Sequence, residues 1–294
     1  MMKLIFLGTS ASKPTSDRNP SSIALQYNNG EFMLFDCGEG AQRQMIKKVS
    51  PMKISKIFIT HLHADHIIGL VGLIQSMKLN GRTQLLEIFV PKDTIEYMKQ
   101  LFSIPYFSAD FDINVVEVFD QKIEFDGYWI KPFPVSHGVP AVGYIFSTND
   151  SRGKFNKKLC EELGIKGEMF SLLEKNGKID INGKEILLDE VTGKKRKGKK
   201  IVYTGDTEKI VVFPEEAYKC DVLIHDSTFI SEEDKKETYH STVKEACEVA
   251  ELLSAKKLVL THISQRYETK EVKEESKKYC ENAIVAEDFL EITL

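Results

Sequence analysis

The stretch that decides the fold is Ile57-Phe58-Ile59-Thr60-His61-Leu62-His63-Ala64-Asp65-His66. A short apolar run is followed there by three histidines and one aspartate within six positions. Neutral imidazole is a common zinc ligand, so a dense histidine cluster directly after a strand is typical of a metal centre. The alternative interpretation is an exposed polar turn that binds nothing.

The same arrangement recurs along the chain, because several predicted apolar strands are each followed at once by a His or an Asp. Strands predicted over residues 56–60, 129–135, 199–203, 221–224 and 257–260 lead to His61, His137, Asp206, Asp226 and His262, respectively. Open α/β sheets bind their ligands at the carboxyl ends of the strands. We therefore expect an α/β fold in which these five strand ends converge on one site.

Length and composition indicate an ordinary globular protein. The 294 residues are enough for one large α/β domain or two smaller ones, and the net charge of −4 does not mark a nucleic-acid binder. Five dispersed cysteines without a CxxC spacing argue against a disulfide framework and for a reducing compartment. No signal peptide and no apolar run of the ~20 residues that a membrane span needs are recognisable, so we predict a cytoplasmic protein.

Turn and capping signals mark further elements. The Asn-Gly pairs in Asn28-Asn29-Gly30 and Asn182-Gly183 predict two hairpins, because both residue types tolerate the positive φ of a tight turn. Thr242 and Glu245 have the spacing of a capping box ahead of an apolar stripe, which predicts a helix that begins there. His240 is therefore expected just before a helix N-terminus.

Residues 152–200 differ from the rest of the chain. They predict two short helices and a hairpin with little alternating core pattern, which indicates an arm inserted into the domain. The segment ends with a basic run, Lys194-Lys195-Arg196-Lys197-Gly198-Lys199-Lys200. Such a run is equally consistent with a solvated loop and with an electrostatic contact to RNA.

The number of candidate ligands favours two metal ions over one, because a single catalytic zinc usually takes three protein ligands. We hypothesise that one zinc ion is held by His61, His63 and His137, that a second is held by Asp65, His66 and His262, and that Asp206 bridges them. Two ions about 3.5–4 Å apart suit the hydrolysis of a phosphodiester, since they activate water and stabilise both the attacking and the leaving oxygen.

Asp226 and His240 are candidates for acid–base chemistry beside the metals. A helix N-terminus disfavours the imidazolium form of His240, and Asp226 could compensate as a nearby anion. The alternative, that His240 merely ends a helix and Asp226 forms a turn, is equally consistent with the residues alone.

These residues resemble the metallo-β-lactamase fold, whose HxHxDH motif stands at His61–His66, and within it the ribonuclease Z family. The resemblance covers nearly the whole chain. It rests on the opening Leu7-Gly8-Thr9-Ser10 with Pro14 and Arg18-Asn19, on Phe35-Asp36-Cys37-Gly38-Glu39-Gly40, and on Gly205-Asp206-Thr207, His225-Asp226-Ser227-Thr228-Phe229, His240-Ser241-Thr242 and Leu260-Thr261-His262. The last motifs together are more specific than HxHxDH alone.

The resemblance implies one domain over residues 1–294 with a four-layer αβ/βα sandwich and a protruding arm, and a homodimer. It implies two Zn²⁺ per subunit on the ligands assigned above, although Mn²⁺ or Fe²⁺ could occupy the same ligands. Asp65 would also accept the proton of the attacking water, and Asp226 with His240 would assist departure of the 3′ oxygen. The arm at 152–200 would be the tRNA-binding exosite.

The chain departs from the family pattern in three places. Asp226 stands where the family usually has Glu, Ser16 stands where a Lys is common, and Gly164-Ile165-Lys166-Gly167 replaces a Gly-Pro-rich arm tip. The shorter carboxylate of Asp226 should still orient His240.

The expected function is zinc-dependent removal of 3′ trailers from precursor tRNA, which leaves a 3′-hydroxyl on the tRNA and a 5′-phosphate on the trailer. Two alternatives remain. One is a metallo-phosphodiesterase of the same fold that acts on small esters and needs no arm. The other is a metal-stabilised tRNA-binding protein without catalysis.

Overall fold

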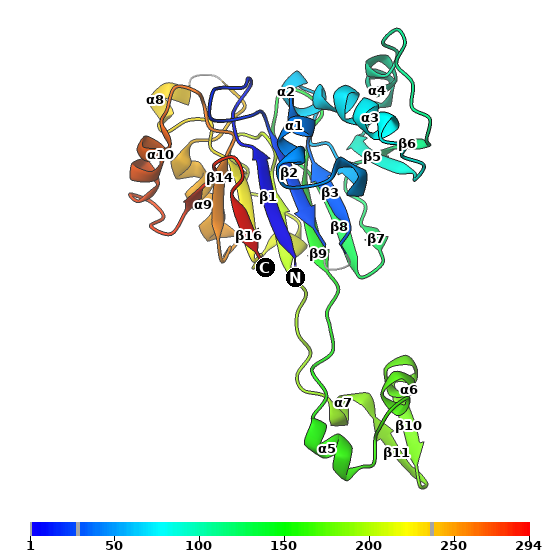
Figure 1. Cartoon of the computed structure of the whole chain (residues 1–294). Coiled ribbons are helices and arrows are strands. Elements are labelled where there is room, and N and C mark those ends of the chain that lie inside the picture. Colours follow the sequence, from blue (N-terminus) through cyan, green and yellow to red (C-terminus); the bar gives the residue numbers. More distant parts are fainter. Residues whose placement is uncertain (1, 28–29, 236–237) are drawn as a thin grey trace. The chain divides into compact units, whose positions relative to one another are not determined.

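A computed structural model describes residues 2–27, 30–235 and 238–294 (Figure 1). The chain divides into two compact units, one formed by Met1–Phe146 with Lys200–Leu294 and the other by Ser147–Lys199. Among the described residues, no helix is long and apolar enough to cross a membrane.

The first sheet of the larger unit has the strand order β16-β1-β2-β3-β4-β5-β6 over the described residues. The pairs from β16 to β3 are antiparallel, and those from β3 to β6 are parallel. The strands are β1 (Lys3–Gly8), β2 (Ser22–Gln26), β3 (Phe32–Phe35), β4 (Ile54–Phe58), β5 (Leu86–Pro91), β6 (Ile113–Val118) and β16 (Glu291–Thr293). β2 and β3 pair as the first hairpin signal predicts, but Asn28 and Asn29 of its turn lie outside the described residues.

The second sheet has the order β15-β14-β13-β12-β9-β8-β7 within the described part of the chain. β12 to β15 run parallel, so their carboxyl ends lie at one edge. The strands are β7 (Ile123–Phe125), β8 (Tyr128–Pro134), β9 (Val142–Thr148), β12 (Lys200–Tyr203), β13 (Val222–Asp226), β14 (Leu258–Thr261) and β15 (Ile284–Val285).

Helices cover the outer faces of both sheets and give the four-layer αβ/βα sandwich that the family resemblance implies. α1 (Ala41–Ile46), α3 (Gly69–Leu79) and α4 (Ile95–Leu101) pack on the first sheet, and α9 (Val243–Leu252) and α10 (Thr269–Ser276) pack on the second. The remaining helices of this unit are η1 (Pro51–Lys53), α2 (Ala64–Ile67), η2 (Glu215–Ala217) and α8 (Glu232–Lys235).

Strand β1 shows why its residues are apolar on both faces. Leu4 and Phe6 point into the core between the sheets, whereas Ile5 and Leu7 point toward the helices, because successive side chains of a strand alternate. A strand buried on both faces reads as a continuous apolar run, which is the pattern that the sequence has here.

The predicted capping box is present at the start of α9. The Thr242 hydroxyl accepts the amide hydrogen of Glu245, and the Glu245 carboxylate accepts the amide hydrogen of Thr242. α9 therefore begins at Val243, and His240 lies just ahead of it, as the sequence predicts.

The smaller unit has a small core of its own, made of Cys160, Ile165, Leu173, Ile186 and Val191. The two helices and the hairpin predicted for this region are confirmed, and one further short helix is present. They are α5 (Lys157–Glu162), α6 (Met169–Asn176), β10 (Lys178–Ile181), β11 (Lys184–Leu187) and α7 (Leu188–Val191).

One disulfide joins Cys247 of α9 to Cys280, four residues beyond the end of α10. The dispersed spacing of the cysteines argued against disulfides, and that prediction is wrong for this pair. The two residues are 33 apart in sequence, and the packing of α10 on α9 rather than any local spacing brings them together. Cys37, Cys160 and Cys220 are buried and free.

Replacing both Cys247 and Cys280 by Ser should lower the free energy of unfolding by about 2–4 kcal/mol, because the cross-link restricts the unfolded chain. We expect the melting temperature to fall by several degrees in oxidising buffer, measured by calorimetry, with activity at 25 °C unchanged. Addition of dithiothreitol should lower the wild-type melting temperature toward that of the variant. Equal melting temperatures of wild type and variant without reductant would contradict the stabilising role.

Candidate metal centre and catalytic site

Three imidazoles from two strand ends form the first donor group. His61 and His63 follow β4, and His137 follows β8. Nδ1 of His63 lies 3.0 Å from Nε2 of His61 and 3.1 Å from Nε2 of His137. Ligand atoms of one tetrahedral zinc ion lie about 3.3 Å apart at the usual bond lengths. The three nitrogens are therefore close enough together to bind one ion.

The opposite ring nitrogens fix the orientation of two of these imidazoles. Nδ1 of His137 lies 3.1 Å from the carbonyl oxygen of Tyr239, which only accepts, so Nδ1 carries the proton. The Thr60 hydroxyl lies 3.0 Å from Nδ1 of His61 and also bonds a buried carboxylate, so it accepts from this ring. Nε2 of both rings is then an electron-pair donor. Burial lowers the pKa of His61 well below its ordinary value, which favours the neutral ligand form.

Two carboxylates and two imidazoles form the second donor group. Oδ2 of Asp206 lies 3.3 Å from Nε2 of His66 and 3.2 Å from Nε2 of His262. Oδ2 of Asp65 lies 3.5 Å from each of the same two nitrogens. Oδ2 of Asp206 is also 3.7 Å from Nε2 of His61, so this carboxylate faces both groups.

Several buried atoms of the second group have no hydrogen-bond partner. Within the described residues these are Nε2 of His66, Nε2 of His262 and Oδ1 of Asp206. Unpaired buried polar atoms are costly and uncommon, and imidazole nitrogen and carboxylate oxygen are typical metal ligands. Burial raises the pKa of Asp206, but the adjacent His262 and His66 more than reverse this and keep it well below the ordinary value. The donor set therefore fits a divalent metal ion.

Asp226 and His240 form a bonded pair beside the second group. Nδ1 of His240 lies 2.8 Å from Oδ2 of Asp226, so the shorter carboxylate at this position does reach the imidazole. Asp226 is fully buried and also accepts the amide hydrogens of Thr207 and Thr228 and the hydroxyl hydrogen of Thr228, at 3.1, 2.9 and 2.7 Å. Burial of the ring lowers the pKa of His240, but Asp226 outweighs it and raises this pKa to about 9.

Asp36 is a supporting residue that the sequence reasoning did not assign. Its buried carboxylate accepts hydrogen bonds from the Thr60 amide at 2.8 Å and from the Tyr203 hydroxyl at 2.8 Å, and it lies 2.9 Å from Nδ1 of His66. It thereby directs Nε2 of His66 toward the second group. A signal was present, because Asp36 follows the apolar strand β3 in the same way as the assigned residues follow theirs.

The N-terminal loop contributes a backbone contact to the site. The Ser12 amide donates to Oδ2 of Asp65 at 3.0 Å, a contact that no sequence pattern indicated. Buried bonds hold this loop, since the Arg18 guanidinium donates to the Thr9 hydroxyl and to the Ala286 carbonyl, both at 2.6 Å.

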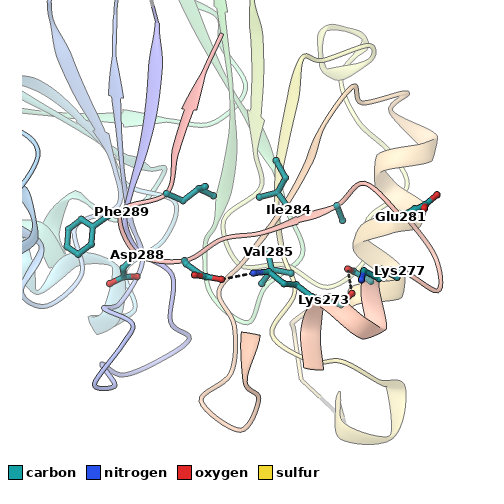
Figure 2. A pocket seen from close by; sticks show the side chains of 11 residues that line it. Lys273, Lys277, Glu281, Ile284, Val285, Asp288 and Phe289 are labelled. Atoms are coloured by element: carbon teal, nitrogen blue, oxygen red, sulfur yellow. Dashed lines mark hydrogen bonds and ion pairs between the residues drawn. The ribbon is translucent and has the colours of Figure 1, made fainter. Parts of the chain in front are cut away.

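Ala286, which accepts the hydrogen bond of Arg18, belongs to a segment, residues 283–290, that crosses from α10 toward β16 (Figure 2). Together with α10 it lines a cavity of about 570 Å³, and Lys273 of α10 bonds Glu287 at 2.8 Å. Asp288 accepts hydrogen bonds from the Thr9 hydroxyl, the Asn19 amide and the Gln44 amide group. The C-terminal segment therefore fixes the loop that contacts Asp65.

The structure brings all nine predicted site residues into three groups, each with its ligand atoms within 4.8 Å of one another, and the second and third groups share Asp206 and His262. The groups are His61, His63 and His137; Asp65, His66, Asp206 and His262; and Asp206, Asp226, His240 and His262. His225, which was predicted to follow a strand but lies within β13, is in none of these groups of described residues. It shares a face of β13 with Leu223, which packs toward the outer helices, whereas Asp226 points to the opposite face.

Comparison with known proteins agrees with this architecture. Residues 190–263 match the model of the beta-lactamase superfamily domain, and residues 2–104 match that of the anti-Pycsar protein Apyc1. Ribonuclease Z of Thermococcus sibiricus is 47% identical, over 98% of this chain and 95% of the relative. Among solved structures, human tRNase Z, short form, is similar with a TM-score of 0.71 and 26% sequence identity. The match covers 99% of this chain and 98% of that one.

A metallo-beta-lactamase fold protein, YhfI from Bacillus subtilis, is 18% identical with a TM-score of 0.71, over 99% of this chain and 98% of that one, and it shows the fold alone. The 47% identity to the Thermococcus sibiricus protein, over almost the full length of both chains, shows the family as well as the fold. The chain has the metallo-β-lactamase fold and belongs to the ribonuclease Z family.

Proposed function

We propose that this chain is a metal-dependent endoribonuclease that removes 3′ trailers from precursor tRNA, leaving a 3′-hydroxyl on the tRNA and a 5′-phosphate on the trailer. The observation that carries the proposal is the convergence of two donor groups and the Asp226–His240 pair in a chain 47% identical to a ribonuclease Z. The proposed setting is a cytoplasmic homodimer.

His61, His63 and His137 would hold one zinc ion, and Asp65, His66 and His262 would hold a second, with Asp206 between them. Oδ2 of Asp206 lies 3.7 Å from Nε2 of His61 in the first group and 3.2 Å from Nε2 of His262 in the second, which supports this bridging position. When bound, such ions activate water and stabilise charge on the oxygens of the scissile phosphate. Mn²⁺ or Fe²⁺ could bind to the same nitrogen and oxygen ligands.

Asp65 would accept the proton of the attacking water. Its carboxylate lies at the edge of the second group, is partly exposed, and is held by the Ser12 amide at 3.0 Å. A carboxylate oriented in this way can act as a general base on a water molecule that enters from solvent.

His240 would give a proton to the departing 3′ oxygen, positioned by Asp226. The 2.8 Å bond occupies Nδ1 of His240, which leaves Nε2 as the nitrogen that can face substrate. Because Asp226 is buried and accepts three further hydrogen bonds, it is held firmly as the partner of this imidazole.

The smaller unit, residues 147–199, would bind the body of the tRNA. It carries most of the basic run of residues 194–200, whose Lys195 side chain is 70% exposed. Exposed lysines bind phosphates and release counterions, so they supply affinity without requiring a base sequence. Lys200 differs, because its Nζ bonds the carbonyl oxygen of Tyr218 in the larger unit.

The test is cleavage of a precursor tRNA with a 3′ trailer by the purified protein with zinc, with the product ends mapped. Cleavage after the discriminator nucleotide is expected for wild type, and no cleavage is expected for His63→Ala, which lacks a donor of the first group. Binding of tRNA by the variant should remain measurable by filter binding. Cleavage at the normal rate by His63→Ala would refute the metal role.

The same assay separates the two alternatives. A phosphodiesterase for small esters would cleave bis(p-nitrophenyl) phosphate but leave precursor tRNA intact. A non-catalytic binding protein would bind tRNA and cleave neither substrate.

His240→Ala should slow the chemical step by about 10²- to 10⁴-fold, because a positioned acid would be lost. Single-turnover cleavage with enzyme in excess measures that step. Metal content, measured by atomic emission, should equal that of wild type. A loss of metal in proportion to the loss of rate would instead make His240 a ligand.

Deletion of residues 155–192 removes the folded core of the smaller unit but keeps the basic run of residues 194–200. It should raise KM for precursor tRNA, because the surface that contacts the tRNA body is lost, and it should spare bis(p-nitrophenyl) phosphate. The chain can be rejoined by a short linker, because the Gly193 amide donates to the Lys154 carbonyl at 2.9 Å. Steady-state kinetics on both substrates measure the effect. Equal losses on the two substrates would argue against an exosite.

A charge-matched pair of variants provides the control for this prediction. In one variant, Gln replaces Lys194, Lys195 and Lys197. This variant should have a higher KM for tRNA, and that KM should depend less on salt concentration. In the control variant, Gln replaces three exposed lysines outside the arm, Lys99, Lys244 and Lys270, which removes the same charge. Its KM for tRNA and the salt dependence of that KM should equal those of wild type.

A further inference from the structure

A mostly apolar pocket of about 300 Å³ adjoins the first donor group, since His63 lines both. Its size is at the lower end of small-molecule sites. The other lining residues come from the turn after β4, from α2, from the start of α4, and from the segment after His137: Leu62, Ile67, Thr94, Tyr97, Val139 and Pro140.

The polar groups of Thr94 in this pocket are already bonded elsewhere. Its hydroxyl donates to the Pro91 carbonyl, and its amide donates to Oε1 of Glu117 at 3.0 Å. Leu62 and Ile67 pack against the core beneath the pocket. The lining therefore offers mostly apolar surface rather than donors for a phosphate, which suits the face of an aromatic ring.

Tyr97 is the residue best placed to contact such a ring. It lies on α4 and lines the pocket, yet its side chain is 62% exposed. An exposed aromatic beside a nuclease site is a stacking platform for an unpaired base, since every base has a π-face. A nucleobase of the substrate is thus the occupant that the chemistry favours.

The position of the pocket relative to His240 indicates which base. The rings of His63 and His240 each lie beside that of His137, at 5.0 and 5.2 Å between ring centroids, and among the described residues no ring contact joins His63 to His240. His63 and the pocket that it lines therefore lie across His137 from His240. If His240 protonates the departing 3′ oxygen, the last tRNA nucleotide lies on the His240 side of the scissile phosphate. The nucleotide beyond that phosphate then lies on the His63 side.

We propose that this pocket binds the base of the first trailer nucleotide, stacked on Tyr97. The proposal rests on the proposed function, because it needs an RNA substrate cut at this site. It makes Tyr97 a positioning residue for the trailer strand, and the subsite accepts any base because stacking does not read hydrogen-bonding edges.

The experiment compares wild type, Tyr97→Ala and Tyr97→Phe on three precursor tRNAs, one unmodified, one abasic at the first trailer nucleotide and one abasic at the discriminator. Tyr97→Ala should lower kcat/KM on the unmodified substrate by about 5- to 150-fold, and Tyr97→Phe should not. On the substrate that is abasic in the trailer, wild type and Tyr97→Ala should be equal. On the other abasic substrate the full loss should persist.

Tyr279→Ala is the matched control, because Tyr279 is 47% exposed and lies outside the pocket. Metal content, melting temperature and mass by light scattering should be the same for all variants. Unchanged kcat/KM in Tyr97→Ala, or a loss that vanishes only on the discriminator-abasic substrate, would overturn the assignment. A halved mass with losses on every substrate would overturn it in favour of a contact between copies of the chain. Failure of wild type to cleave any precursor would instead refute the proposed function.

Discussion

The site depends on one buried anion, the carboxylate of Asp36, which joins the two sheets where their strands end. It accepts hydrogen bonds from Thr60 after β4 of the first sheet and from Tyr203 of β12 in the second, and it contacts His66 of α2. A buried carboxylate is tolerated only with such a full set of donors. The same hydrogen bonds that stabilise the carboxylate orient the His66 ring directly and the His61 ring through Thr60. Asp36 therefore contributes both to the contact between the sheets and to the orientation of the donor groups.

Strand geometry explains why the donors separate into groups. Side chains alternate along β13, so His225 points to the helices while Asp226 points to the site. Parallel strands β12, β13 and β14 end at one edge, which puts Asp206, Asp226 and His262 near one another although they are far apart in sequence. The first group depends instead on the end of β4 and the end of β8, which belong to opposite sheets. The donor groups therefore form only where the strand ends of the two sheets lie side by side.

The sequence predicted those parts of the molecule that have a local signal. Apolar strands followed by His or Asp located the residues of the donor groups, and the capping box located α9. The Ser12 amide and the Cys247–Cys280 bond were missed because each depends on packing between distant segments, which leaves no mark in local spacing. Asp36 had a signal, the strand before it, but it was interpreted as part of a hairpin and of a family motif and not as a residue of the site. The smaller compact unit comprises Ser147–Lys199, and the segments that lead into and out of its helices pair at Ser151 with Arg196 and at Phe155 with Thr192.

The wide spacing of the donors along the chain has a consequence during synthesis. The first donor group draws on residues 61–137, but the second needs His262 of the other sheet, and Asp65 and His66 have no complete partner set before that residue is made. A growing chain on the ribosome therefore carries an incomplete centre until both sheets have formed. Metal affinity and folding are then linked, because only the finished sandwich presents every ligand at once.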